Sequence, residues 1–297
     1  MNMSDYILVA VDGSVASQRA VQWAANTAHK RGVVLRLAAA YSIPEFLYAE
    51  GLAPPEEVYA ELKDEAMEKI EQARELAVEI APDLEIDHMI SQQSPIHMLL
   101  DASADASMIV MGSRGLGGFS GMVLGSVSAA VVSHAQCPVV VLRSDNELTE
   151  ENKYGPVVVG IDGSEISKKA TEFAFAEAKA RGVKVIALHT WVDTHMQGAL
   201  SAMALGADIW ADIEKEQHKV VREQLAPALE HYPDVEVETV ITHDRPVHAL
   251  AEIAKQAQLL VVGSHGRGGF KGMLLGSTSR ALLHSAPCPL VVVRPTE

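Results

Sequence analysis

The sequence predicts an α/β protein of two tandem domains, each built on a parallel sheet with helices on both faces. The first and second halves of the chain carry the same motifs in the same order. In both halves, short apolar runs alternate with longer segments of helical period, which is typical of parallel strands joined by crossover helices. The length of 297 residues suits two domains that each bury a core of ordinary size.

The internal repeat extends over almost the whole chain. V-A-V-D-G-S at residues 9–14 returns as V-G-I-D-G-S at 159–164, and the glycine-rich segment 111–128 returns at 262–279. A repeat of about 150 residues is much longer than a solenoid unit, so each copy is expected to be a complete domain.

The domains predicted from this repeat are residues 1–145 and 154–297, separated by the polar segment around 145–155. The strands predicted within them are short apolar runs bounded by Gly, Pro or polar residues. They are residues 7–11, 34–41, 85–90, 108–112 and 139–143 in the first half, and residues 157–161, 184–190, 235–242, 259–263 and 290–294 in the second.

Helices are expected between the strands, and their ends carry start and stop signals. The first spans residues 17–31 and ends at Gly32, since glycine readily adopts the left-handed conformation that terminates helices. The second covers residues 55–81, before Pro82; the third opens at Pro95 and the fourth at Ser126. The second half repeats this order, and the halves diverge most in 42–53 and 192–207, which are expected to be variable loops.

Composition argues against several classes of function. Lys and Arg number 24 against 39 Asp and Glu, and the net charge of −15 repels nucleic acid and anionic lipid. No apolar run approaches the roughly 20 residues that span a bilayer, and no basic segment precedes the first one, so no membrane insertion is expected. A single disulfide would contribute little to the stability of a fold of this size, so Cys137 and Cys288 are expected to be buried thiols. The predicted compartment is the cytoplasm.

The most informative motif follows the fourth predicted strand of each half. The pattern G-x-x-G-x9-G-S occurs there twice, from Gly112 to Ser126 and from Gly263 to Ser277. Glycines let the backbone approach a ligand closely and present successive N–H groups to an anion. The final Gly-Ser pair opens a helix, whose free N–H groups and positive dipole end favour phosphate. The pattern therefore predicts a phosphate cradle in each half.

A glycine-rich segment before a helix can also be only a flexible loop with a serine cap, but its duplication at identical spacing favours a binding site. Two other phosphate motifs are absent. No Gly-Lys pair is followed by Ser or Thr, and G-x-G-x-x-G fails because its last position is Ser120 in one half and Lys271 in the other.

Asp12 and Asp162 end the first predicted strand of each half, in the sequence D-G-S. Asp-Gly is a common turn, and Ser14 or Ser164 could simply cap the next helix. Position favours a functional role, because ligands of open α/β sheets bind at the carboxyl ends of strands where the strand order reverses. If the fourth strand pairs with the first, this carboxylate could accept hydrogen bonds from a ribose hydroxyl or an adenine amino group.

Other polar residues are weaker candidates. Arg114, His265 and Arg267 lie within the glycine loops, where positive charge meets phosphate or only solvent. The 12 histidines form no H-E-x-x-H or Cys/His cluster, so no metal held by side chains is expected. No Ser/His/Asp or Cys/His set has the spacing of a catalytic nucleophile, and the chain is interpreted as a binder without catalytic residues.

On these motifs, the chain resembles the universal stress protein family over nearly its whole length, once in each half. In particular it resembles the tandem-domain, ATP-binding type of actinobacteria such as mycobacteria. The resemblance implies two flavodoxin-like domains (Rossmann-like and similar to adenine nucleotide alpha hydrolases), each with a five-stranded parallel sheet of order 3-2-1-4-5. It also implies a homodimer formed through sheet-edge or helix contacts, with residues 139–143 and 290–294 as candidates for contact between the halves.

The resemblance further implies one ATP site in each half, with Mg²⁺ on the phosphate oxygens. Asp12 and Asp162 would contact the adenosine beside Ala10 and Gly160, and the methyl group of Ala10 could narrow the first site; Ala40 or Asp193 would touch the base. Residues expected along the ribose and phosphates are Gly112, Ser113, Arg114, Gly115, Leu116, Gly117 and Gly118, and Gly263, Ser264, His265, Gly266, Arg267, Gly268 and Gly269. Those expected to close the phosphate end are Gly125, Ser126 and Val127, and Gly276, Ser277 and Thr278.

The predicted function is that of a cytoplasmic ATP-binding stress-response protein without strong catalysis. Bound nucleotide would bias the conformation or oligomeric state that an unknown protein partner meets. A slow ATPase or nucleotidyl-transfer enzyme of the same fold is the alternative from another class, and a protein-interaction module with a structural nucleotide is a third. ATP turnover and the dependence of self-association on ATP distinguish them.

Overall fold

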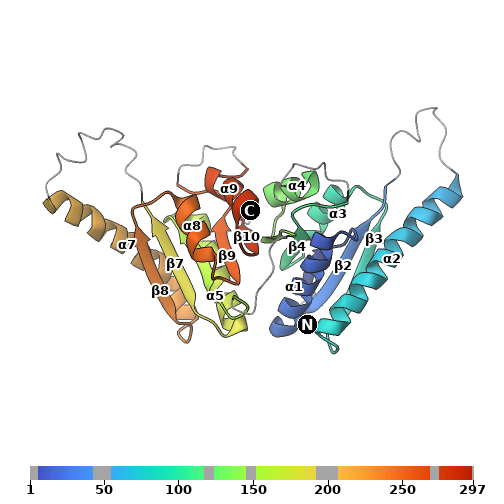
Figure 1. Cartoon of the computed structure of the whole chain (residues 1–297), viewed down its shortest axis with the longest axis horizontal. Helices are drawn as coiled ribbons and strands as arrows, with labels where there is room; N and C mark the ends of the chain where they lie inside the picture. The colour runs from blue at the N-terminus through green and yellow to red at the C-terminus, as the bar shows by residue number, and fades with distance from the viewer. Residues whose placement is uncertain are drawn as a thin grey trace. The chain divides into compact units, whose positions relative to one another are not determined.

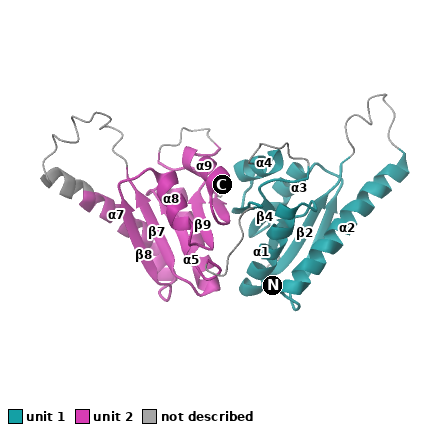
Figure 2. Cartoon of the chain, in the orientation of Figure 1, with its two compact units in different colours: residues 1–146, 296–297 teal, residues 147–295 magenta. Residues whose placement is uncertain are grey.

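The computed structural model describes residues 6–42, 55–116, 124–144, 152–191, 207–267 and 274–295, with the backbone alone at 207–213. The chain divides into two compact units, shown in Figure 2. Unit 1 comprises Met1–Asn146 with Thr296–Glu297, and unit 2 comprises Glu147–Pro295. Both units are α/β, as predicted.

Strands and helices alternate in the described part of unit 1 (Figure 1). The strands are β1 (Tyr6–Ala10), β2 (Val34–Ala40), β3 (Ile86–Ser91), β4 (Met108–Gly112) and β5 (Val139–Leu142). The helices are α1 (Val15–Arg31), α2 (Glu56–Ile80), α3 (Pro95–Ala102) and α4 (Ser126–His134). The strands pair in parallel in the order β3-β2-β1-β4-β5, which confirms the predicted 3-2-1-4-5 topology.

Unit 2 repeats this topology. Its strands are β6 (Val157–Ile161), β7 (Val185–Thr190), β8 (Val237–Thr242), β9 (Leu259–Gly263) and β10 (Leu290–Val293). Its helices are α5 (Glu165–Arg181), α7 (Ala207–His231), α8 (Pro246–Ala254) and α9 (Ser277–Ser285). The parallel order is β8-β7-β6-β9-β10, so the strand order reverses beside β6 as it does beside β1 in unit 1.

The central strands are continuously apolar because helices cover both faces of each sheet. In unit 1, α1 packs on α2 and α3 packs on α4. Helices α1 and α2 lead to strands on one side of β1 (β2 and β3), whereas α3 and α4 lead to strands on its other side (β4 and β5). Because such crossovers are right-handed, the two helix pairs lie on opposite faces of the sheet. Successive side chains of β1 point to opposite faces, yet Ile7, Leu8 and Val9 are all 0% exposed. This burial explains why the strands read as unbroken apolar runs rather than as alternating patterns.

The ends of α1 and α5 follow the same capping scheme. The hydroxyl oxygens of Ser14 and Ser164 each accept a hydrogen bond at 3.2 Å from the N–H three residues later, so the capping role considered for these serines is confirmed. Helix α1 therefore begins at Val15, two residues before the predicted start. Strand β8 begins at Val237 rather than at residue 235, because the N–H of Val235 donates to Tyr232 O at 3.1 Å in the preceding turn.

A buried ion pair stabilises unit 2. The side chains of Glu177 and Arg181 are 0% and 2% exposed, and Arg181 Nη2 lies 2.7 Å from Glu177 Oε2. Arg181 Nη1 donates to Gln258 Oε1 at 3.0 Å, and Gln258 Nε2 donates to Gly155 O at 2.7 Å. The network links α5 to the segments that precede β6 and β9. At the position equivalent to Glu177, unit 1 has the uncharged Thr27.

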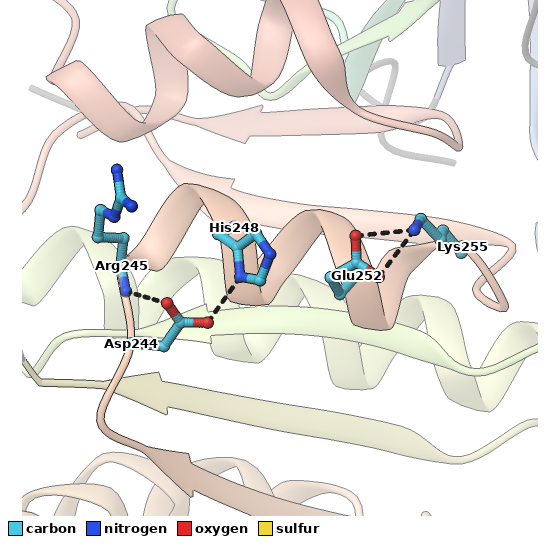
Figure 3. A network of polar contacts seen from close by, with 5 residues as sticks. All are labelled: Asp244, Arg245, His248, Glu252 and Lys255. Atoms are coloured by element: carbon cyan, nitrogen blue, oxygen red, sulfur yellow. Dashed lines mark hydrogen bonds and ion pairs between the residues drawn. The ribbon is translucent and has the colours of Figure 1, made fainter.

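The start of α8 is held by side chains rather than by a serine cap (Figure 3). In unit 1, Ser94 caps α3 by accepting a hydrogen bond from the N–H of His97 at 3.3 Å. In unit 2, Asp244 accepts from the N–H of Arg245 at 2.6 Å and from His248 Nδ1 at 2.8 Å. One turn later Lys255 Nζ donates to Glu252 at 2.7 Å. Asp244 thus ties the residue before α8 to a side chain of its first turn, but it does not cap the helix N–H groups as Ser94 does.

These contacts lower the pKa of the Asp244 carboxyl, and the hydrogen bond from His248 is the largest cause. The His248→Ala variant is therefore expected to raise the pKa of Asp244 back toward its ordinary value, as measured by carbon-detected NMR during an acid titration. Because the folded pKa is lowered, the stabilisation is present above the unfolded pKa and is lost as pH falls through the folded one. Glu252→Gln is the control and should leave the Asp244 titration in place. An unchanged Asp244 pKa in His248→Ala would contradict the assignment.

Candidate functional site

The turn after the first strand of each unit holds an aspartate in a fixed orientation. Gly13 and Gly163 have φ of +84° and +80°, a conformation that residues with a Cβ rarely adopt. Asp12 Oδ1 accepts the N–H of Ser14 at 3.0 Å, and Asp162 Oδ1 accepts the N–H of Ser164 at 2.9 Å. The D-G-S motif therefore fixes each carboxylate at the carboxyl end of its strand.

The second carboxylate oxygen reaches the glycine loop that follows the fourth strand. Asp12 Oδ2 accepts the N–H of Leu116 at 3.2 Å, across 104 residues of chain. In unit 2, Asp162 Oδ2 accepts the N–H of Arg267 at 3.1 Å. Both contacts require the glycine before the donor, because a Cβ at Gly115 or Gly266 would overlap the carboxylate. In each half, a hydrogen bond therefore connects the aspartate directly to the glycine loop.

Helices α4 and α9 begin with backbone N–H groups that no described side chain caps. Their N-cap residues, Gly125 and Gly276, have no side-chain oxygen that could accept a hydrogen bond from those groups. The N–H of each N-cap donates to the loop, to Ser113 O and Ser264 O respectively, at 2.7 Å. An uncapped helix start combines free donors with the positive end of the helix dipole, so it attracts anions.

Two buried serines hold this helix start against the loop. Ser128 Oγ donates to Gly112 O at 2.8 Å, and Ser279 Oγ donates to Ser264 O at 2.7 Å. These hydroxyls are thus engaged within the protein. Ser113 and Ser264 are themselves 3% and 0% exposed, and they contribute their backbone oxygens to the loop.

Each unit has a cavity at this edge of its sheet, with a volume of about 520 Å³ in unit 1 and about 490 Å³ in unit 2. Most of the predicted residues line these cavities. In unit 1 they are Ala10, Asp12, Ala40, Gly112, Arg114, Gly115, Leu116, Gly125, Ser126 and Val127. In unit 2 they are Gly160, Asp162, Gly263, His265, Gly266, Arg267, Gly276, Ser277 and Thr278. The Ala10 methyl group does not make the first cavity the smaller one.

Five predicted residues, Gly117, Gly118, Asp193, Gly268 and Gly269, lie outside the described residues. Sequence reasoning also missed part of the cavity wall. Met98 and Lys69 line the unit 1 cavity from α3 and α2, and Thr190 and Leu250 line the unit 2 cavity from β7 and α8. The start of the third helix was a usable signal, since Pro95 opens that helix at the same sheet edge. Nothing in the local pattern marked Lys69, which lies within a long, largely polar helix.

Other candidate features do not form sites. Among the described residues, no three or more His, Cys, Asp or Glu side chains could hold a metal ion, and no helix is long and apolar enough to cross a membrane. Cys137 and Cys288 are buried free thiols, as predicted. Burial raises the pKa of both to about 12, so they remain protonated at neutral pH. Placement in the cytoplasm stays a prediction.

Fold and site together define a class of protein. Each unit is a doubly wound α/β domain whose cavity lies where the strand order reverses, between an aspartate turn, a glycine loop and an uncapped helix start. Small ligands of open α/β sheets bind at this position. The chain is therefore a tandem protein of the α/β class with one candidate anion-binding cavity in each unit.

The chain belongs to the universal stress protein family, whose model matches residues 3–143 and 153–294. It is 40% identical over 305 residues to a universal stress protein of Mycobacterium tuberculosis, covering 97% of this chain and 94% of the relative. It is 39% identical over 293 residues to one of Mycolicibacterium smegmatis, covering 97% of each. The predicted similarity to tandem mycobacterial members is confirmed.

The fold also resembles a solved structure. The crystal structure of a universal stress protein from Archaeoglobus fulgidus matches with a TM-score of 0.69 and 21% identity, covering 98% of each chain. At this level of identity the likeness concerns the fold alone.

Proposed function

We propose that each unit binds one ATP molecule, with Mg²⁺ on the phosphates, and that the bound nucleotide regulates a stress response rather than undergoing efficient catalysis. The observation that carries this proposal is the duplicated arrangement of aspartate turn, glycine loop and uncapped helix start. The hydrogen bonds of the aspartate agree between the units to within 0.1 Å: 3.0 and 2.9 Å from the serine N–H, and 3.2 and 3.1 Å from the loop N–H.

The cavities suit the two ends of a nucleotide. Their volumes of about 520 and 490 Å³ lie in the range of small-molecule sites, roughly 300–1,000 Å³. In unit 1, Ala10, Ala40 and Met98 offer apolar surface for a base. At the other end, the first turns of α4 and α9 offer N–H donors to phosphates. The carboxylate of Asp12 or Asp162 has lone pairs left for a ribose hydroxyl.

Basic side chains line both cavities, although the chain as a whole carries a net charge of −15. Lys69 and Arg114 line the first cavity, and His265 and Arg267 line the second. Since the described residues contain no acidic cluster suited to a metal, Mg²⁺ would be held by phosphate oxygens and water. Mg²⁺ would thus enter the site already bound to the phosphates of the nucleotide.

The first test is to denature freshly purified protein and to identify and count any released nucleotide by chromatography and mass spectrometry. Titration calorimetry with ATP and Mg²⁺ on nucleotide-free protein follows. The expected result is close to two ATP per chain without turnover. No nucleotide on purification and no binding heat would overturn the proposal. Released ADP, or phosphate release above the buffer background, would favour the slow ATPase.

The regulatory part of the proposal is tested by self-association. We infer that ATP changes the oligomeric state, with a homodimer as one of its states, and so changes the surface that a protein partner meets. Sedimentation of the full chain with and without ATP is expected to differ. Identical sedimentation with saturated sites would favour an interaction module in which the nucleotide is only structural.

A further inference from the structure

The two cavities differ behind the second strand of each sheet. Ala10 pairs with Ala38 and Gly160 pairs with Leu188, so Ala39 and His189 occupy equivalent positions. Helices α2 and α7 are both 25 residues long, and their eleventh residues are Ala66 and Gln217. Two small residues in unit 1 therefore correspond to two larger polar residues in unit 2.

In unit 2, the larger pair fills this space. His189 is 4% exposed; its Nδ1 donates to Ile161 O at 2.7 Å, and its Nε2 lies 2.8 Å from the side-chain amide of Gln217. Among the described residues, the unit 2 cavity has no lining side chain from α7. In unit 1, the cavity continues past the end of β2 to α2 and is lined there by Ala39, Ala66 and Lys69.

Lys69 brings a positive charge to this extension. Its Cγ, Cδ and Cε atoms lie 3.5 to 3.9 Å from the point where a Cβ on Gly13 would stand, so its stem runs along the turn that holds Asp12. The Lys69 side chain is 33% exposed, and its ion pair with Glu65 is long, at 3.7 Å. Its amino group can therefore turn toward a ligand at low cost.

Unit 2 places its cation differently. The residue equivalent to Lys69 is Val220, the fourteenth residue of α7. There the guanidinium of Arg267, from the glycine loop, lies directly against Gly163. The equivalent residue of unit 1, Leu116, is uncharged and 68% exposed. Each unit thus covers its Asp-Gly turn with one cation, but among the described residues only the unit 1 cation comes from the long helix, where the cavity extends to Ala39 and Ala66.

We propose that the cavity of unit 1 contains an additional subsite, lined by Val11, Ala39, Ala66 and Lys69, that binds a phosphate group on the ribose of an adenine nucleotide. The inference rests on the proposed function, in which Asp12 contacts the adenosine. The carboxylate of Asp12 repels an anion, whereas Lys69 lines the cavity beside the same turn and carries the positive charge that a ribose phosphate needs. A lysine acts as a point charge for phosphate, and the small alanines leave room for it.

The test compares AMP with adenosine 2′,5′-bisphosphate and adenosine 3′,5′-bisphosphate, which each add one ribose phosphate to AMP. Binding of each to the full chain is measured by titration calorimetry. The wild-type chain is expected to bind AMP at two similar sites and to bind at least one bisphosphate about 10 to 100 times more tightly at one of them, the gain typical of one charge-assisted hydrogen bond.

Three variants exchange the cavity residues that differ between equivalent positions of the two units. Lys69→Val introduces the residue found at the equivalent position of unit 2, Val220. This variant is expected to bind bisphosphate and AMP with about equal affinity. Ala39→His with Ala66→Gln recreates the His–Gln pair and is expected to do the same by filling the subsite. His189→Ala with Gln217→Ala is the matched control; it opens space in unit 2 without a lysine and should create no second preferred site.

The outcomes separate this inference from the function on which it rests. If neither ATP nor AMP binds, the proposed function fails. If AMP binds but the bisphosphate ratio is about one in the wild-type chain, or is the same in wild type and Lys69→Val, the subsite is wrong and the proposed function stands. Thermal unfolding of each variant verifies that the fold is intact, and the surface position of Lys69 makes that variant the decisive one.

Discussion

Replacing Glu177 by alanine is expected to lower the free energy of unfolding of unit 2 by about 3–5 kcal/mol, because the charge of Arg181 would remain buried without its partner. The two side chains are 0% and 2% exposed, so water cannot replace the lost carboxylate without opening the structure. The carboxylate that orients Arg181 for its hydrogen bond to Gln258, and through Gln258 to Gly155, would also be lost. The measurement is urea unfolding of the full chain, followed by hydrogen exchange to assign the loss to unit 2.

Two controls distinguish the effect of an unpaired buried charge on stability from the effect of removing side-chain volume. Thr27→Ala, at the equivalent position of unit 1, is expected to cost much less, since it removes no charged side chain. Glu177→Leu combined with Arg181→Met removes both charges and should recover most of the stability lost in the single variant, because an apolar pair of similar volume often replaces a buried ion pair without cost. A loss below about 1 kcal/mol in Glu177→Ala would mean that water or another group satisfies Arg181.

Replacing Gly115 by alanine is expected to weaken nucleotide binding in unit 1 by about 10- to 100-fold, the equivalent of losing one charge-assisted hydrogen bond. The new Cβ would overlap Asp12 Oδ2, so the carboxylate must rotate away from the N–H of Leu116. Both the aspartate and the glycine loop would then leave the positions proposed for ligand contact. Calorimetry at low ATP concentration should show the number of occupied sites falling from two to one.

The chain contains two matched controls for this variant. Gly266→Ala should have the same effect on the other unit, because its Cβ would overlap the carboxylate of Asp162. Gly32→Ala changes a glycine with φ of +66° and nothing within 4 Å of its Cβ position, so it should reduce stability slightly and leave both sites intact. Two undiminished sites in Gly115→Ala would show that nucleotide does not depend on the contact between Asp12 and the loop.

Local patterns predicted the architecture well because each element has its own signal. Unbroken apolar runs such as residues 7–9 identified buried parallel strands, and Gly32 marked the end of α1. The repeat then gave each element a second, independent copy. Within the described residues, errors in the elements were confined to their ends, such as residue 235, where a single turn hydrogen bond decides whether the chain has already become a strand.

The site could be predicted where its residues belong to a motif of fixed spacing. The glycines and Asp12 have unusual residue types at fixed spacing, and the structure places them around one cavity. Lys69 and His189 carry no such mark, because an isolated lysine on a polar helix and a histidine in an apolar strand are ordinary in sequence. Their roles depend on which helix packs beside which strand, as α2 does beside β2, and that is decided by tertiary contacts.

The pairing of β1 with β4 has a consequence for the order in which each unit can assemble during synthesis. Ser107 Oγ, at the start of β4, donates to Tyr6 O, 101 residues earlier in the chain. While the ribosome is still producing α3, β1 has only β2 beside it, and its other edge remains an open apolar template. The nascent chain thus exposes the future centre of the sheet until β4 emerges, so this is the interval in which chaperones would matter most. Because the repeat is in tandem, the same vulnerable interval occurs twice per chain, and unit 1 can close before β9 of unit 2 is made.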